Sequence, residues 1–207
     1  AFAKIYGNPD PALTEVILTG VGGETVTAVY TREPGESAGS YDLLTVGFAE
    51  AQQNYTISFA EGGADGKFII NKRPITVTAD GVNRIFGDPL EIEYTYQITS
   101  GSVVEGDTLL GELSCDVMQA AGQYPITQGT LTNDNNPNYS ITYVEGIYII
   151  AKASIGVTVP ASAYFKVYGD SDLLMTAEAT GIYGEAITIA FVRQSGEDAG
   201  LYDIIGA

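Results

Sequence analysis

The sequence predicts an all-β protein made of tandem modules of about 80 residues, most simply immunoglobulin-like β-sandwiches, with β-grasp-like modules as the alternative. Short runs rich in Thr, Val, Ile and Tyr alternate between apolar and polar residues, which is the period of a half-buried strand. Turn-forming Gly, Pro, Asn and Asp recur at intervals of roughly 8 to 12 residues, and no long stretch has helical periodicity. We therefore expect roughly six or seven short strands per module and little helix.

An internal repeat sets the size of the module. Residues 193–203 repeat the sequence pattern of residues 32–42 at an offset of 161 positions. A more divergent copy lies between them at residues 121–125. The period is about 80 residues, which divides the 207-residue chain into two complete units and part of a third. We expect modules at residues 1–73, 74–153 and 154–207.

Each unit opens with the same turn. A basic residue, an aliphatic one, an aromatic one, Gly and then Asp or Asn recur at residues 4–8, 84–88 and 166–170. Gly and Pro fix a turn after each short apolar run. Further strands are expected at residues 25–31, 39–48, 54–59 and 66–79, and in the second unit at residues 138–143 and 146–152.

The joints between the units carry no flexible linker. Residues 72–79 and 152–159 each run from the last strand of one unit into an alternating strand, without a Gly-rich or Ser-rich stretch, so we expect stiff joints. The strand at residues 75–79 could close the first unit or open the second; in the latter case the first unit lacks its leading strand. Lys72 and Lys152, at matching positions, could form covalent crosslinks to Asn or Asp side chains. We favour a simpler interpretation, in which each is a solvent-exposed lysine at the end of a strand.

Composition excludes several classes of function. The chain has no His and a single Cys, Cys115, so neither an internal disulfide nor a Cys-based metal cluster can form. The 26 acidic against 9 basic side chains give a net charge of −17, which repels nucleic acid and anionic lipid. No apolar run approaches the ~20 residues that a membrane span needs. We expect no catalytic residue, no cofactor-binding residue and no resident cofactor.

Two features suggest binding sites, and each has a structural interpretation that we favour. Tyr41, Tyr124 and Tyr202 each follow a Gly by two positions, as in the tyrosine corner of β-sandwiches; the other interpretation is stacking on sugars. Residues 133–138 are rich in oxygen ligands suited to Ca²⁺. They lack the spacing of an EF-hand loop, which favours a polar turn.

Acidic neighbours in two turns raise the question of catalysis. Glu33 with Glu36, and Glu197 with Asp198, could form the carboxylate pair of a glycoside hydrolase. Two carboxylates in the same turn seldom point toward the same glycosidic bond. A repeated module also rarely carries a single active site. We therefore predict that the protein is not an enzyme.

Four motifs in a fixed order resemble a known family. They are the Tyr-Gly turn at residues 4–9, Gly-Glu-x-Ala-Gly-x-Tyr-Asp at residues 35–42, Asn-Tyr-x-Ile-x-Phe at residues 54–59, and an apolar strand that ends in Lys before Ile-Thr-Val-Thr-Ala at residues 66–79. Over essentially the whole chain, this pattern resembles the MBG domain family of the Tyr-Gly-x type. The resemblance implies tandem domains of a large secreted bacterial surface or adhesin-like protein.

The second unit departs from this pattern. It has Phe86 in place of Tyr, Gln119 and Ala120 in place of the acidic pair of the third unit, and Pro125 in place of Asp. Such departures matter little for a structural repeat. If Asp42 and Asp203 bound a ligand, the second unit would lack that function.

Three functions from different classes remain. The first is a non-catalytic stalk or filament segment of a secreted bacterial cell-surface adhesin, whose partners are other copies or neighbouring modules of the same surface protein. The alternative is that the modules themselves bind a glycan, a host or surface ligand, or a protein through exposed Tyr or strand edges. The third, a carbohydrate-active enzyme, is disfavoured by the missing His and by the repeat.

The third unit is expected to be incomplete. Counterparts of residues 54–72 do not follow Asp203, as in a segment of a longer array. Residues 160–207 should therefore be unstable in isolation or be completed by another chain, because strand edges and part of the core are exposed.

Overall fold

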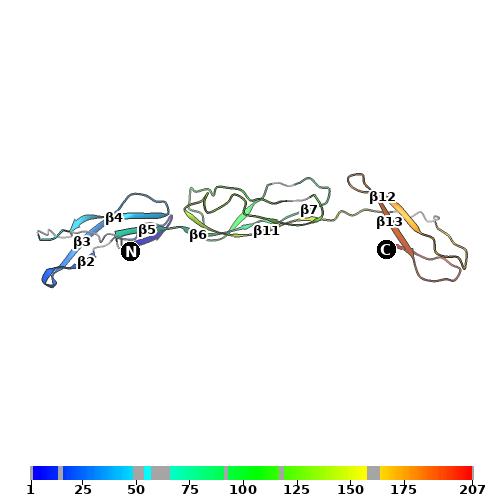
Figure 1. Ribbon diagram of the computed structural model, residues 1–207, viewed down its shortest axis with the longest axis horizontal. Coiled ribbons are helices and arrows are strands. Elements are labelled where there is room, and N and C mark those ends of the chain that lie inside the picture. The colour runs from blue at the N-terminus through cyan, green and yellow to red at the C-terminus, as the bar shows by residue number, and fades with distance from the viewer. Residues whose placement is uncertain are drawn as a thin grey trace. The chain divides into compact units, whose positions relative to one another are not determined.

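The computed structural model describes residues 2–13, 16–48, 54–56, 66–90, 93–116, 119–157 and 164–206. In these residues the regular structure is β-strand, apart from one 3₁₀ turn at Val21–Gly23, which confirms the all-β prediction (Figure 1). The chain divides into two compact units: Ala1–Val82 with Glu91–Met118 and Gln123–Ile149, and Asn83–Leu90 with Gln119–Gly122 and Ile150–Ala207.

The first repeat forms a five-stranded mixed sheet. Its strands are β1 (Phe2–Ile5), β2 (Val16–Thr19), β3 (Thr25–Arg32), β4 (Gly39–Phe48) and β5 (Lys67–Asn71), in the order β1-β5-β4-β3-β2 (Figure 1). Strand β5 lies between β1, to which it is parallel, and β4, to which it is antiparallel. Alternate residues of β5 therefore point into the core, where Phe68 and Ile70 are 0% and 2% exposed beside Leu43.

The second repeat begins with strand β6 (Arg73–Ala79), whose alternation buries Ile75, Val77 and Ala79. It pairs in parallel with β10 (Tyr139–Val144) and antiparallel with β8 (Tyr96–Ser100). The strand expected at residues 75–79 thus pairs with two strands of the second repeat.

A second sheet of this repeat has the order β7-β11-β9. Its strands are β7 (Val82–Ile85), β11 (Gly146–Ala151) and β9 (Gly122–Ile126). Tyr148 of β11 and Ile126 of β9 are both fully buried. Strand β11 matches β5 in sequence and, like β5, buries alternate residues.

The third repeat contributes a sheet of three antiparallel strands, β12 (Met175–Thr180), β13 (Ala186–Arg193) and β14 (Ile204–Gly206), among its described residues. These strands match β2, β3 and the second part of β4 in sequence position.

Most of the strands expected from the sequence are found. Strands β3 and β4 cover residues 25–31 and 39–48, and the long run at residues 66–79 divides at Lys72 into β5 and β6. Of the strand expected at residues 54–59, residues 54–56 form no strand and residues 57–59 lie outside the described residues. The immunoglobulin-like sandwich, its β-grasp-like alternative and the three module boundaries stay predictions.

One expectation about the second joint is wrong. Residues 152–159 were expected to run into an alternating strand; residues 152–157 form no strand, and residues 158 and 159 lie outside the described residues. A strand needs a partner for its hydrogen bonds: β6, at the corresponding position, pairs with β10, whereas residues 152–157 pair with no strand among the described residues.

Candidate functional site

Four charged side chains of the first repeat form a cluster, here called the ion cluster: Lys4, Asp10, Arg32 and Glu36. The Lys4 ammonium lies 2.7 Å from Asp10 Oδ1 and also pairs with Glu36. Arg32 pairs through Nε with Asp10 Oδ2 and through Nη2 with Glu36 Oε1, both at 2.6 Å. Two cations from β1 and β3 thus share two carboxylates from the turns that follow these strands.

The cations of the ion cluster are the buried members. The side chains of Lys4 and Arg32 are 3% and 8% exposed, whereas those of Asp10 and Glu36 are 35% and 69% exposed. Hydrogen bonds from Arg32, opposed by burial, lower the pKa of Asp10 to about 2. Burial lowers the pKa of Lys4, but hydrogen bonds to Asp10 and Glu36 outweigh it and raise that pKa overall.

The Arg32 guanidinium also lies against two aromatic rings of the first repeat. It lies 4.9 Å from the centre of the Phe68 ring and 5.4 Å from that of Tyr41, within the range of a cation–π contact. It further donates to the backbone carbonyl of Glu33 at 2.9 Å. Its role is therefore to join the turn after β3 to the sheet.

The tyrosine corner is present at two of its three predicted positions. The Tyr41 hydroxyl donates to the carbonyl of Ser37 at 2.7 Å, and the Tyr202 hydroxyl donates to that of Asp198 at 2.7 Å. This confirms the structural interpretation for both residues. For Tyr124 it stays a prediction.

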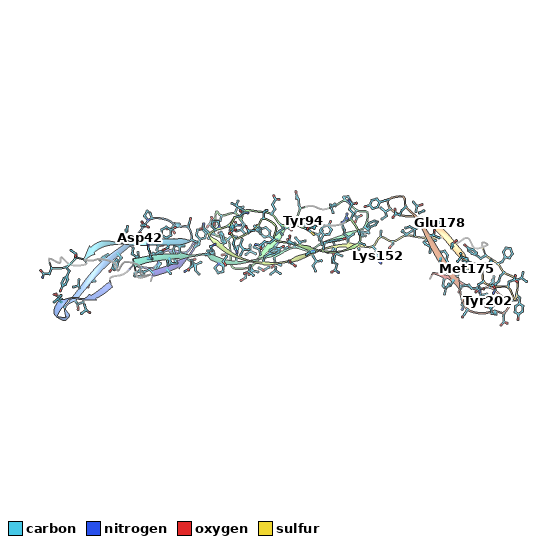
Figure 2. All side chains as sticks on the ribbon, viewed as in Figure 1. Asp42, Tyr94, Lys152, Met175, Glu178 and Tyr202 are labelled. Atoms are coloured by element: carbon cyan, nitrogen blue, oxygen red, sulfur yellow. The ribbon has the colours of Figure 1, made fainter. Side chains whose placement is uncertain are left out.

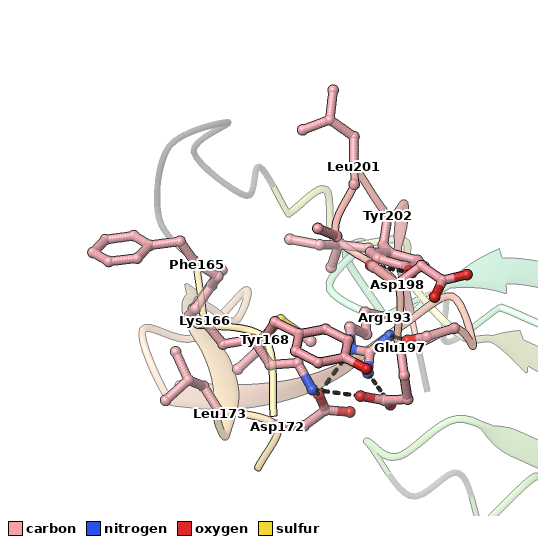
Figure 3. A pocket seen from close by; sticks show the side chains of 16 residues that line it. Phe165, Lys166, Tyr168, Asp172, Leu173, Arg193, Glu197, Asp198, Leu201 and Tyr202 are labelled. Carbon is pink, nitrogen blue, oxygen red and sulfur yellow. Dashed lines mark hydrogen bonds and ion pairs between the residues drawn. The ribbon is translucent and has the colours of Figure 1, made fainter. Parts of the chain in front are cut away.

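The ion cluster recurs in the third repeat. Lys166 lies 2.8 Å from Asp172 and 3.0 Å from Glu197. Arg193 lies 2.8 Å from Asp172 and 2.6 Å from Glu197. Figure 3 shows these four side chains joined by dashed lines beside Tyr202, whose ring centre is 4.9 Å from the Arg193 guanidinium carbon.

The second repeat has lost the ion cluster as a set. Arg84, Leu90, Cys115 and Gln119 stand at the four matching positions. The Arg84 Nε is buried without a hydrogen-bond partner, and burial raises the pKa of the Cys115 thiol. Sequence reasoning did not connect these four positions. The joint change of all four in one internal copy is the signal that could have linked them.

The two acidic pairs that were considered for catalysis have other interaction partners. Glu33 accepts the backbone N–H of Asp42 at 3.0 Å, and Glu36 belongs to the ion cluster. In the third repeat Glu197 belongs to the matching cluster, while Asp198 supplies the carbonyl of the tyrosine corner.

The side chains of residues 133–138 mostly support their own loop. Asn133 Oδ1 accepts the N–H of Ile141 at 2.6 Å, and the buried Asn136 exchanges two hydrogen bonds of 2.8 Å with Leu110. These contacts favour the polar turn. The described residues contain no group of three or more Cys, Asp or Glu side chains arranged to hold a metal ion.

The opening turn of the first repeat packs against the second repeat, inside the first compact unit. The Tyr6 hydroxyl donates to Asp107 Oδ2 at 2.9 Å, and its ring stands edge-on to Tyr139, with 5.6 Å between ring centres. Gly7 adopts a φ of +80°, and a Cβ there would overlap Val104. The turn was predicted; its contact with the next repeat was missed.

Arg73, the first residue of β6, ties this junction together. Its guanidinium donates to the carbonyl of Tyr6 and to Asn8 Oδ1, each at 3.1 Å, and to the carbonyl of Ser102 at 2.8 Å. A further bond of 2.8 Å runs from the Ala38 N–H to Asn138 Oδ1. One arginine thus bridges the opening turn of one repeat and a loop of the next. Lys72, beside it, is exposed.

A matching contact occurs inside the second compact unit. Phe86 and Gly87 stand where Tyr6 and Gly7 stand in the first repeat. The Phe86 ring is edge-on to Tyr183 at 5.3 Å, and a Cβ on Gly87 would lie 2.7 Å from Ile182. The loop at residues 181–185 matches the loop that receives Tyr6. The opening turn therefore makes the same kind of contact twice.

These features define a tandem β-repeat protein in which the opening turn of one repeat contacts a loop of the next. The chain matches the family model of the MBG domain (YGX type) at residues 2–64 and 75–148 and belongs to this family. The MBG domain is a non-catalytic repeat domain that occurs in bacterial surface proteins. Comparisons with curated proteins and with solved structures found no match. Among the described residues, no helix is long and apolar enough to cross a membrane.

Proposed function

We propose that this chain is a stalk or filament segment of a secreted bacterial cell-surface adhesin, in which the first repeat holds the second at a fixed angle outside the cell. The observation that carries the proposal is the junction at Tyr6, Gly7 and Arg73. A flexible tether would place a polar linker between repeats, but here β5 and β6 are separated by Lys72 alone.

The partners in this proposal are neighbouring modules of the same surface protein. The junction uses an aromatic ring, a glycine too close for any side chain and a bridging arginine. Three such contacts restrict rotation about the single connecting residue. A junction built in this way holds the first and second repeats at a defined spacing rather than as independent beads.

Two glycines in the first compact unit give a matched test of the junction. Gly7 and Gly22 have φ values of +80° and +78°, but a side chain on Gly22 would meet no atom within 4 Å. Gly7→Ala and Gly22→Ala therefore impose the same backbone strain, and only the first pushes against the second repeat.

The spacing can be measured between spin labels at Ser40→Cys and Glu145→Cys, two exposed sites, in a Cys115→Ser background. Electron–electron double resonance should give one narrow distance distribution for the parent and for Gly22→Ala. With Gly7→Ala the distribution should broaden or shift. A parent distribution as broad as that of Gly7→Ala would refute the rigid segment.

The alternative function is binding of a glycan or protein partner by the modules themselves. It draws on the exposed aromatic side chains Phe165 and Tyr168 of the third repeat, which are 84% and 72% exposed. Specific glycan-array binding by the purified segment, lost in Tyr168→Ala, would replace the stalk with a binding module.

A further inference from the structure

Two tyrosines from consecutive repeats share one hydrogen-bond acceptor at the junction. The Tyr6 hydroxyl donates to Oδ2 of Asp107 at 2.9 Å, and the Tyr139 hydroxyl donates to the same oxygen. The two rings stand edge-on, with 5.6 Å between their centres. Because both hydroxyls converge on one oxygen, the ring edges that carry them are directed toward each other.

The two rings differ in their access to solvent. The Tyr139 hydroxyl also accepts the backbone N–H of Val104 at 3.0 Å, and this residue is only 4% exposed. Tyr6 is half-buried at the surface of the junction. One ring is therefore enclosed by the second repeat, while the other can be reached from outside.

Asp107 provides a base in contact with both phenolic protons. Hydrogen bonding to Asp107 raises the pKa of Tyr6, and burial together with the same kind of bond raises the pKa of Tyr139 to about 12, so both phenols are neutral at physiological pH. A neutral phenol that loses an electron must also lose its proton, and a carboxylate in hydrogen-bond contact can accept it. Asp107 is itself half-buried and can pass the proton on to water.

We propose that Tyr6 and Tyr139 are the site of an oxidative crosslink, a carbon–carbon bond between the two rings that joins the first repeat covalently to the second. The co-reactant is a haem peroxidase with hydrogen peroxide. Each ring gives up one electron and its phenolic proton, and the two phenoxyl radicals couple at the carbons beside their oxygens. The hydrogens on those carbons then move as protons to the oxygens and restore both phenols. The chain loses two hydrogen atoms, and one hydrogen peroxide becomes two waters.

The hydrogen bonds at the junction already resemble the arrangement in the product. In two phenols joined at the carbons beside their hydroxyls, the hydroxyls lie next to each other, as the shared oxygen of Asp107 places them here. Tyr6 is oxidised first because it is open to solvent, and Tyr139 is oxidised through the contact between the rings. The crosslink requires the junction alone and does not rest on the stalk function.

The test exposes the whole chain to a haem peroxidase and hydrogen peroxide, in a Cys115→Ser background that removes the free thiol. Mass spectrometry of the digested chain should find the peptides that contain Tyr6 and Tyr139 joined, with the loss of two hydrogen atoms. The yield per chain should not fall on dilution, because both rings belong to one chain. Absence of the joined peptides, or a crosslink that forms between chains only, would overturn the proposal.

Tyr94 and Tyr148 provide a comparison pair in the second repeat, where Figure 2 labels Tyr94. Their ring centres are 6.2 Å apart at an interplanar angle of 77°, against 5.6 Å and 78° for Tyr6 and Tyr139. Each pair has one buried and one half-buried member. The Tyr94 hydroxyl, however, shares its hydrogen bond with Cys115 rather than with a carboxylate. The crosslink at Tyr6 and Tyr139 should therefore form in clear excess, and equal yields would refute the role of the shared carboxylate.

Asp107→Asn separates proton transfer from positioning. The amide keeps a side-chain oxygen for the two hydroxyls but is not a base at physiological pH. Most of the crosslink should be lost, while the distance distribution between spin labels at Ser40→Cys and Glu145→Cys stays that of the parent. An undiminished yield would refute proton transfer to Asp107. A loss of the crosslink together with a broader distance distribution would overturn it as well, because Asp107 would then act by positioning the rings.

Discussion

Removing Asp10 should loosen the first repeat in a manner that depends on pH. In Asp10→Asn the buried cations Lys4 and Arg32 keep only Glu36 as a carboxylate partner. The shift of the Asp10 pKa from 3.8 to about 2 corresponds to about 2.4 kcal/mol of stability at neutral pH. Because Asp10 is 35% exposed, solvent screening reduces this to about 1 kcal/mol.

The sign of the pH dependence follows from the lowered pKa. The carboxylate of Asp10 stabilises the fold fully above the unfolded pKa of 3.8, and the stabilisation is lost as the pH falls toward the folded pKa of about 2. The parent and Asp10→Asn should therefore differ most at pH 6 and converge near pH 2.

Hydrogen exchange followed by mass spectrometry measures this difference locally. A loss of about 1 kcal/mol should lower the protection of amides in β4 and β5 by about fivefold at pH 6. Asp172→Asn removes the matching carboxylate of the third repeat and should leave β4 and β5 unchanged. If the two variants affected β5 equally, or if the effect of Asp10→Asn persisted undiminished near pH 2, the role of the ion cluster would be refuted.

Three other substitutions, one of them with a matched control, test the core, a loop and the junction. Phe68→Ala should destabilise the first repeat by about 3 to 5 kcal/mol in urea denaturation, because the ring is fully buried; a cost below about 1 kcal/mol would contradict the packing around β5. Asn136→Ala should cost about 1 to 3 kcal/mol in thermal denaturation, since the N–H and C=O of Leu110 lose their partly buried hydrogen bonds to Asn136, whereas the exposed Asn135→Ala should cost less than half as much. Burial and a hydrogen bond to Asp107 raise the pKa of Tyr139 to about 12. The neutral hydroxyl therefore stabilises the fold fully below the unfolded pKa of about 10, and this stability is lost as the pH rises through about 12. In an ultraviolet titration of tyrosine ionisation, Tyr139→Phe should remove one step near pH 12.

Local patterns in the sequence were sufficient for most of the strands. Alternation places Val77 inside β6, and repeated Gly-x-Tyr spacing predicts the corners at Tyr41 and Tyr202. Both signals lie within a few residues, where the backbone period fixes which side chains share a face.

Contacts between distant residues could not be predicted from local patterns. Lys4 meets Glu36 across 32 positions, and Tyr6 meets Asp107 across 101. Neither contact follows from a fixed spacing along the sequence. Each depends on how β5 enters the sheet beside β1. The expected strand after Lys152 failed for the same reason: alternation indicates a strand, but only a partner strand provides its hydrogen bonds.

The parallel pairing of β1 with β5 also determines how the first repeat would respond to pulling. If Phe2 and Asn71 are drawn apart along the chain, the two strands are loaded in opposite directions along their length. The hydrogen bonds between them then bear the load together in shear, rather than opening one at a time. In the second repeat the parallel pair β6 and β10 is loaded in the same way between Arg73 and Val144. The first repeat would therefore resist extension through the pair β1 and β5, and the stretch from Arg73 to Val144 of the second repeat through the pair β6 and β10.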